Sequence, residues 1–265
     1  MRRTPKLGQH FLTGVWAAYK LVEASGARRG ERVLEIGPGH GALTRELLKT
    51  GARVVAIEKD EALAAELRGT FAQEIADGRL LLLEGDVRDF EPDVHGLSAG
   101  DYILAANIPY YITGEILRQF LTAAAQPKRL VVLIQKEVAE RIVAHDGKES
   151  ILSISVKAYG VPRIVAKVAR GNFSPPPSVD SAILLVDDIS RAFFDGLDEA
   201  LFFRVVHAGF SSKRKQLLGN LGGAFGKEVA REALERCGIA TNTRAEDVST
   251  PLWGSFARDI ARHVQ

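Results

Sequence analysis

Five short apolar runs recur between residues 32 and 134, separated by stretches that have helical spacing. The runs are residues 32–36, 53–57, 79–83, 102–106 and 130–134, all rich in Val, Ile and Leu. Runs that are apolar at nearly every position are typical of central parallel strands covered on both faces. Between them, residues 60–76 and 113–123 show helical periodicity, with Asp60 and Thr113 as candidate N-caps. This alternation predicts an α/β fold with a doubly wound, Rossmann-like sheet.

The pattern changes after residue 150. Residues 151–187 are rich in β-forming sequence, with candidate strands at 163–168 and 182–186 on either side of a triple proline. From about residue 190 only helical patterns remain, at 197–208, 213–221, 227–237 and 251–264. We therefore expect a larger domain over residues 1–187 and a smaller, all-helical domain over residues 188–265.

Composition excludes several classes of protein. Cys237 is the only cysteine, so an internal disulfide is impossible, and the six histidines show no metal-ligand spacing. The basic N-terminus lacks the apolar core of a signal peptide, and no apolar run is long enough to cross a bilayer. The formal net charge is only +2, so a role with nucleic acid must depend on local clusters of basic residues. We expect a cytoplasmic, monomeric protein with no metal and no membrane partner.

A glycine-rich turn follows the first apolar run. The sequence Gly37-Pro38-Gly39-His40-Gly41-Ala42 lies between a strand pattern and a helical one. In open α/β sheets ligands bind at the carboxyl ends of the strands, where glycines let the backbone approach closely. The turn predicts a nucleoside cofactor, but its glycines fit both NAD and S-adenosylmethionine.

Two acidic residues end the next two strand patterns. Glu58 lies about twenty residues after Gly37, where a carboxylate can accept hydrogen bonds from both ribose hydroxyls. Asp86 ends the third run, where it can accept from the amino group of adenine, an interaction that dehydrogenases do not require. The alternatives are a solvated ion pair between Glu58 and Lys59, and a turn or N-cap role for Asp86. The two acids together favour S-adenosylmethionine as the cofactor.

The sequence Asn107-Ile108-Pro109-Tyr110 follows the fourth apolar run. The lone pair of an exocyclic adenine amine is delocalised into the ring, and two acceptors for its N–H bonds can localise it. The Asn107 side-chain oxygen can be one acceptor, and the main-chain carbonyl of Ile108, held outward by Pro109, can be the other. Tyr110 can stack on an extruded base. The alternative is a plain turn after a strand.

The chain resembles the ribosomal RNA adenine dimethyltransferases, which modify two adjacent adenosines of small-subunit RNA. Several motifs occur in the family's order and cover essentially the whole chain. They are Gly8-Gln9-His10-Phe11-Leu12, Glu35-Ile36-Gly37-Pro38-Gly39, Asn107-Ile108-Pro109-Tyr110, Gln135-Lys136-Glu137-Val138, Phe173-Ser174-Pro175-Pro176-Pro177, Val179-Asp180-Ser181, Phe210-Ser211-Ser212-Lys213-Arg214-Lys215 and Arg244-Ala245-Glu246.

The resemblance implies a set of site residues. The expected cofactor contacts are Gln9, His10, Leu12, Gly37, Gly39, Glu58, Lys59, Asp86, Val87 and Asn107. The expected catalytic residues are Asn107, Ile108, Pro109, Tyr110 and Phe173, with Phe173 facing the target base opposite Tyr110. Without the family, Phe173 before a proline run is more typical of a core anchor. The chain departs from the family pattern at His10, where Asn is usual, at Tyr111, where Asn is common, and in residues 147–152.

Two clusters of basic residues are candidates for RNA binding. They are Lys213, Arg214 and Lys215, at an expected helix start, and Arg2, Arg3 and Lys6, near the N-terminus. Cations oppose the helix dipole at a helix start, which favours phosphate binding over local stability as the reason for the first cluster. The alternative is a solvated run of charges.

We expect dimethylation of small-subunit (16S) ribosomal RNA during ribosome biogenesis. The nearest rival is the related large-subunit adenine methyltransferase that confers macrolide resistance, whose motifs include Asn-Ile-Pro-Tyr. A non-enzymatic ribosome-assembly factor and a DNA adenine methyltransferase are also compatible with the fold. The DNA enzyme is disfavoured because roughly 80 residues outside the expected catalytic domain leave little room for groove contacts.

Overall fold

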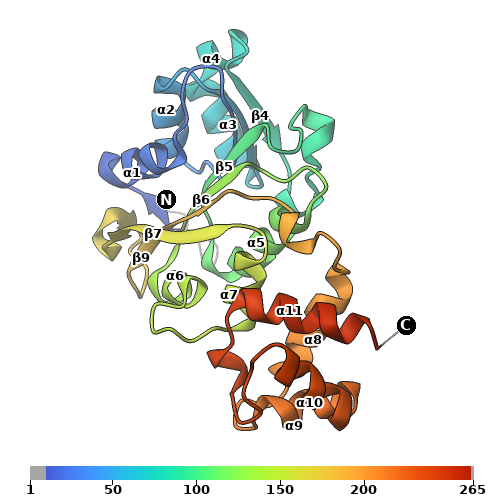
Figure 1. Ribbon diagram of the computed structural model, residues 1–265. Coiled ribbons are helices and arrows are strands. Elements are labelled where there is room, and N and C mark those ends of the chain that lie inside the picture. The colour runs from blue at the N-terminus through green and yellow to red at the C-terminus, as the bar shows by residue number, and fades with distance from the viewer. Residues whose placement is uncertain (1–9, 264–265) are drawn as a thin grey trace. The chain divides into compact units, whose positions relative to one another are not determined.

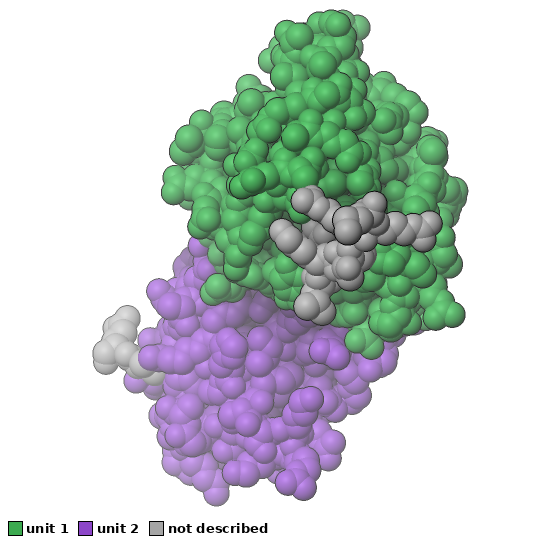
Figure 2. Space-filling view, turned by 180° about the vertical axis from the view of Figure 1, so that it is seen from behind, with its two compact units in different colours: residues 1–139, 160–189 green, residues 140–159, 190–265 purple. Residues whose placement is uncertain are grey.

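The computed structural model describes residues 10–263 and divides into two compact units, coloured separately in Figure 2. The first unit comprises residues 1–139 and 160–189, and the second comprises residues 140–159 and 190–265. The division near residue 189 lies within two residues of the expected boundary. Residues 140–159 were expected in the larger domain, and the structure instead packs them with the C-terminal helices.

The first unit is built on a seven-stranded sheet with the order β4-β3-β2-β5-β6-β9-β7 (Figure 1). The strands are β2 (Arg32–Ile36), β3 (Arg53–Glu58), β4 (Leu80–Glu84), β5 (Tyr102–Asn107), β6 (Arg129–Gln135), β7 (Val161–Val168) and β9 (Ser181–Asp187). The first five are parallel, whereas β9 runs antiparallel to both β6 and β7. The five apolar runs are therefore the five parallel strands, and the predicted Rossmann-like sheet is confirmed.

Helices cover the sheet on both faces. The helices before and between its parallel strands are α1 (Val15–Ser25), α2 (Ala42–Lys49), α3 (Glu61–Thr70), α4 (Ala72–Ala76) and α5 (Thr113–Thr122). Helix α6 (Lys136–Val143) follows β6, and the division between the two units falls within it, after Ala139. Leu21 and Leu47 belong to a core cluster with alternate strand residues such as Val33, and the intervening residues Leu34 and Leu104 are fully buried as well. Burial of both alternating sets is what a sheet covered on both faces requires.

The expected helix caps differ in outcome. The Asp60 side chain accepts hydrogen bonds from the main-chain N–H groups of Ala62 and Leu63, so it caps α3 as predicted. Thr113 is not a cap, because Ile112 occupies that position and Thr113 is the first residue of α5. The expected helix 60–76 is also interrupted at Phe71, between α3 and α4.

The strand order reverses next to β2, which pairs with β3 on one side and β5 on the other. At such a reversal the helices that follow the two strands leave toward opposite faces, and a crevice opens at the carboxyl ends of the strands. The glycine turn follows β2, and the sequence from Asn107 to Tyr110 begins at the end of β5. The topology therefore brings these two motifs to one place.

A second sheet of two short strands lies in the same unit. Strand β1 (Phe11–Leu12) pairs antiparallel with β8 (Phe173–Ser174), with Phe11 opposite Ser174 and Leu12 opposite Phe173. This pairing joins residues near the two ends of the first unit's sequence.

The described residues of the second unit form helices joined by turns and loops, and include no strand. Its helices are α7 (Ile151–Lys157), α8 (Glu199–Gly209), α9 (Leu217–Phe225), α10 (Lys227–Arg236) and α11 (Thr250–Ala261). The β-rich interpretation of residues 151–157 was wrong. Ser150 and Ser153 form a capping box, in which each side chain accepts a hydrogen bond from the other residue's main-chain N–H. This cap stabilises a helix over β-branched sequence.

Over residues 10–263, no helix combines the length and apolarity needed to cross a membrane. The same part of the chain contains no group of three or more His, Cys, Asp or Glu side chains arranged to hold a metal ion.

Candidate active site

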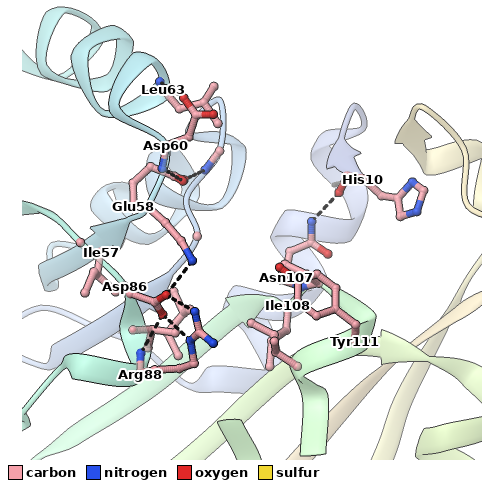
Figure 3. Close-up of a pocket in the computed structure, with 18 of the residues that line it drawn as sticks. His10, Ile57, Glu58, Asp60, Leu63, Asp86, Arg88, Asn107, Ile108 and Tyr111 are labelled. Carbon is pink, nitrogen blue, oxygen red and sulfur yellow. Dashed lines mark hydrogen bonds and ion pairs between the residues drawn. The ribbon is translucent and has the colours of Figure 1, made fainter. Parts of the chain in front are cut away.

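A cavity of about 330 Å³ opens at the carboxyl ends of β2, β3, β4 and β5. Figure 3 shows two groups of side chains along it. Glu58, Asp86 and Arg88, from the ends of β3 and β4, lie on one side, and Asn107 and His10 lie on the other. The cavity therefore has an acidic side and a side formed by the Asn107 motif.

Two residues of the glycine turn, Gly37 and Gly39, also line the cavity. Gly37, Gly39 and Gly41 have φ values of +64°, +59° and +77°, a left-handed conformation that side chains rarely adopt. A Cβ atom at Gly39 would come within 2.8 Å of the Phe11 ring, so the β1 segment packs directly on the turn. These glycines allow both the turn itself and the close approach of β1.

The Glu58 carboxylate holds the turn in place. It is buried at the end of β3 and accepts hydrogen bonds from the main-chain N–H groups of Gly39, at 3.1 Å, and Asp60, at 2.9 Å. Each carboxylate oxygen can accept more than one hydrogen bond, so Glu58 retains capacity for a ligand in the cavity that it lines.

Asp86 is engaged by two cations. Arg88 donates to both of its oxygens, at 3.0 and 2.5 Å, and Lys59 Nζ lies 2.7 Å from Oδ2. The hydrogen bonds from Arg88, and then those from Lys59, hold the pKa of Asp86 well below its usual range despite partial burial. Asp86 is therefore stabilised in its ionised form in the cavity wall. Arg88 was not among the expected site residues, although its position two residues after a strand-end Asp is a usable signal.

Glu35 is a buried carboxyl group beside the glycine turn. It lies on β2, is 1% exposed and lines a smaller cavity together with Gly37, Gly39 and Asn107. Its Oε2 atom has no hydrogen-bond partner among the described residues. Burial raises the pKa of Glu35 to about 8, and the charge of Glu58 acts in the same direction. A buried acceptor without a partner fits a cationic group of a ligand.

The Asn107 side chain is fixed by a main-chain contact. Its Nδ2 donates to the carbonyl of His10 over 2.9 Å, as the dashed line in Figure 3 shows. The amide oxygen Oδ1 is thereby identified as the end left for a ligand, since no hydrogen bond within residues 10–263 uses it. The Pro109 carbonyl accepts from Ile112 N–H at 3.1 Å, and the expected role of the Ile108 carbonyl as the second acceptor of the motif stays a prediction.

Tyr110 is half-buried, and its hydroxyl group lies 2.7 Å from Oγ of Ser181, which is fully buried on β9. Burial raises the pKa of Tyr110, and the charge of Asp180 acts in the same direction. Ser181 is the last residue of the Val179-Asp180-Ser181 motif, whose role the sequence did not reveal. The contact shows that this motif supplies a partner for Tyr110. Tyr111, the next residue, is 76% exposed and also lines the cavity.

Phe173, which the family resemblance places opposite Tyr110 at the target base, is a buried side chain in this structure, and that role stays a prediction. Its side chain is 4% exposed and belongs to the hydrophobic core cluster, and it is absent from the described lining of the cavity. Strand pairing with Leu12 directs Phe173 into the core, so the core-anchor alternative describes it better. Leu12 likewise packs against the core and lines the smaller cavity, whereas Val87 lines the larger one.

One cluster of basic residues belongs to the second unit, and the other lies outside the described residues. Lys213, Arg214 and Lys215 are exposed in a turn before α9, whose N-cap is Gln216, so they precede the helix instead of starting it. None of the three side chains forms an ion pair with another residue in the described part of the chain. Arg2, Arg3, Lys6 and Gln9 lie outside the described residues.

Comparison with known proteins places this site in a family. The sequence model described as "Ribosomal RNA adenine dimethylase" matches residues 2–261. The chain belongs to the ribosomal RNA adenine dimethylase family. Among curated members, the Ribosomal RNA small subunit methyltransferase A of Dehalococcoides mccartyi strain 195 is 40% identical, over 96% of this chain and 87% of its own. The Geobacter sulfurreducens protein of the same name is 36% identical, over 98% and 96%. As a member of this family, the protein is a methyltransferase.

Solved structures agree with the fold. A dimethyladenosine transferase from Plasmodium falciparum superposes with a TM-score of 0.80 at 25% identity, covering 93% of this chain and 96% of its own. The 23S rRNA methyltransferase ErmE superposes with a TM-score of 0.77 at 25% identity, covering 95% and 99%. Both structures therefore share the fold of this chain over nearly its whole length.

Proposed function

We propose that this chain transfers methyl groups from S-adenosylmethionine to the exocyclic amines of two adjacent adenosines in small-subunit ribosomal RNA, two methyls on each. The observation that carries the proposal is the orientation of Asn107. Its amide N–H donates to the His10 carbonyl, which leaves Oδ1 to accept a hydrogen bond from the amine of a target base. The curated relatives named for the small subunit supply the choice of RNA.

The described residues fit S-adenosylmethionine. The unpartnered Oε2 of Glu35 suits the cationic amino group of its methionine part, and Glu58 suits the ribose hydroxyls. Asp86 and Val87 line the same cavity near the expected position of the adenine. We propose that Gly37, Gly39 and Lys59 also contact the cofactor, and that Gln9, which lies outside the described residues, does so as well. When bound, S-adenosylmethionine supplies an electrophilic methyl group.

The protein's own contribution is positioning and charge stabilisation. In the first transfer the side-chain carbonyl of Asn107 and the main-chain carbonyl of Ile108 accept the two N–H bonds of the amine, and in the second transfer one of them accepts the single N–H that remains. These hydrogen bonds localise the lone pair toward the methyl donor. Tyr110 stacks on the base, and the contact between its hydroxyl group and Ser181 holds the ring in position for stacking. The chemistry requires no covalent nucleophile, because the amine itself attacks.

We propose that the helical unit contributes to RNA binding. Lys213, Arg214 and Lys215 are exposed and free of ion pairs with described residues, as phosphate-binding side chains must be. Arg2, Arg3 and Lys6 remain candidates of the same kind. We further propose that the protein is cytoplasmic and acts as a monomer. Light scattering of the purified chain would test the oligomeric state.

The test is transfer of radiolabelled methyl groups to small subunits that lack the modification, followed by digestion of the RNA to nucleosides. Wild type should yield dimethyladenosine. Asn107→Ala should be slower by about 10- to 100-fold, because it removes an acceptor that binds the reacting amine. The matched control is Asn242→Ala, an exposed asparagine of the helical unit, which should retain wild-type activity.

Large ribosomal subunits should be tested as a second substrate in the same assay, because ErmE is named a 23S rRNA methyltransferase and its structure covers 95% of this chain. Large subunits lacking methylation provide that arm. Labelling of the large subunit alone would replace the small-subunit proposal with the large-subunit one. Cofactor binding without transfer to either subunit would indicate a binding role in ribosome assembly.

A further inference from the structure

Three segments that are distant in the sequence meet at His10. Its imidazole Nδ1 lies 2.8 Å from the carbonyl oxygen of Pro175, and its own carbonyl accepts the Asn107 amide at 2.9 Å. The His10 and Tyr110 rings are in contact, with centroids 5.7 Å apart and planes tilted by 33°. One residue therefore contacts the segment after β8 and both ends of the Asn107–Tyr110 motif.

The chemistry of these contacts fixes the directions of the hydrogen bonds. A carbonyl oxygen only accepts, so Nδ1 of His10 carries the proton and donates to Pro175. The Asn107 amide nitrogen only donates, so its oxygen points away from His10. Phe11, the next residue, already pairs with Ser174, so the side chain of His10 extends the β1–β8 contact by one step.

We propose that His10 is a positioning residue for the target base, and that its side chain is not a ligand of the cofactor. This inference rests on the proposed function of the site. Every contact of the His10 side chain described above is with Pro175 or Tyr110, whereas the acidic side of the cavity is formed by Glu58 and Asp86 (Figure 3). By holding Pro175, the imidazole keeps the His10 carbonyl in place to orient Asn107.

The donor atom makes a sharp substitution possible. The amide nitrogen of an asparagine side chain lies as many bonds from the backbone as Nδ1 of histidine, so His10→Asn retains a donor for the Pro175 carbonyl. His10→Leu has a similar shape and no donor. Asparagine is also the residue that the resembling family usually carries here. Positioning by a donor predicts that asparagine substitutes for histidine and leucine does not.

The experiment measures three quantities for wild type, His10→Asn and His10→Leu. These are the Kd of S-adenosylhomocysteine by calorimetry without RNA, and kcat and KM for undermethylated small subunits. We expect His10→Leu to lower kcat by about 3- to 10-fold, as for the loss of one hydrogen bond, with Kd and KM within about 2-fold of wild type. His10→Asn should restore kcat. His145→Asn, at an exposed histidine of the helical unit, is the matched control.

Two results would overturn the inference. A weaker Kd in His10→Leu with kcat unchanged would make His10 a cofactor ligand, and equal loss of kcat in both variants would show that the donor is irrelevant. If His10→Leu does not fold, His10→Asp replaces it, because aspartate has the shape of asparagine without the donor. Failure of wild type to methylate either subunit would instead refute the proposed function, and the inference with it.

Discussion

The hydroxyl group of Tyr110 and Oγ of Ser181 lie 2.7 Å apart, which fastens the last residue of the Asn107–Tyr110 motif to strand β9. Ser181 is fully buried, so its hydroxyl has no access to water as a substitute partner. A residue expected only to stack on a base is thus also bound to the sheet. Ring and hydroxyl should make separable contributions to catalysis.

Tyr110→Phe should keep the stacking surface and lose the link. We expect the rate of methyl transfer to fall by about 2- to 10-fold, and the free energy of unfolding to fall by about 1 kcal/mol, because Ser181 is left without a partner. Tyr110→Ala removes the ring as well and should cost about 1–3 kcal/mol more in transition-state stabilisation. Single-turnover rates and urea unfolding check both. Additive effects of Tyr110→Phe and Ser181→Ala would contradict a direct contact.

The buried carboxyl of Glu35 should make stability depend on pH. Its pKa is raised from an ordinary 4.5 to about 8, so the unfolded chain ionises first as pH rises. The free energy of unfolding should therefore fall between about pH 4.5 and 8, by a few kcal/mol at most, and level off above. Urea unfolding across this range should show that slope in wild type and lose it in Glu35→Gln. Glu91→Gln, an exposed carboxyl, should leave the slope unchanged.

The same group should couple cofactor binding to protons. If the unpartnered Oε2 of Glu35 accepts a hydrogen bond from the cationic amino group of the cofactor, binding near pH 7 requires the Glu35 carboxyl group to ionise. Calorimetric titration of S-adenosylhomocysteine in buffers of different ionisation enthalpy should then report release of close to one proton. Glu35→Gln should reduce the release and weaken binding. Equal release in both proteins would place the titrating group elsewhere.

The helical unit depends on a glycine. A Cβ atom at Gly209 would overlap the ring of the fully buried Trp253, so Gly209→Ala should destabilise the protein by about 1–3 kcal/mol. Gly219 lies inside α9, and a Cβ atom added there would meet no neighbouring group within 4 Å. Gly219→Ala should therefore be neutral or stabilising by up to about 1 kcal/mol. Thermal unfolding of the two variants compares them. Similar melting temperatures would contradict the packing of Gly209 on Trp253.

Replacement of residues 213–215 by alanine should weaken RNA binding in a salt-dependent way. Each phosphate contact to single-stranded RNA contributes about 0.7 to the slope of log affinity against log salt, so the slope should fall by about 2. Filter binding to undermethylated small subunits at several salt concentrations measures it. A control with Lys20, Lys49 and Arg68 replaced removes cations that are already ion-paired, and its slope should be unchanged.

The sequence by itself determined the five parallel strands and the places where they end. Short, continuous apolar runs rich in Val, Ile and Leu indicate buried strands without tertiary information. Gly37 directly follows β2, and Glu58 and Asn107 are the last residues of β3 and β5. The two closing strands were also found, since they too are short and rich in β-branched residues. For these elements the local pattern and the final structure agree in type, but β4 is an edge strand with Leu81 46% exposed, not the central covered strand that its apolar run predicts.

Only the tertiary structure decided how the site is held together. The links from His10 to Pro175 and from Tyr110 to Ser181 join residues 165 and 71 positions apart, and no local spacing encodes them. Phe173 was drawn into the core by strand pairing with Leu12. Residues 151–157 became a helix of the second unit, because a cap and long-range packing outweigh the weak preference of β-branched residues for strands.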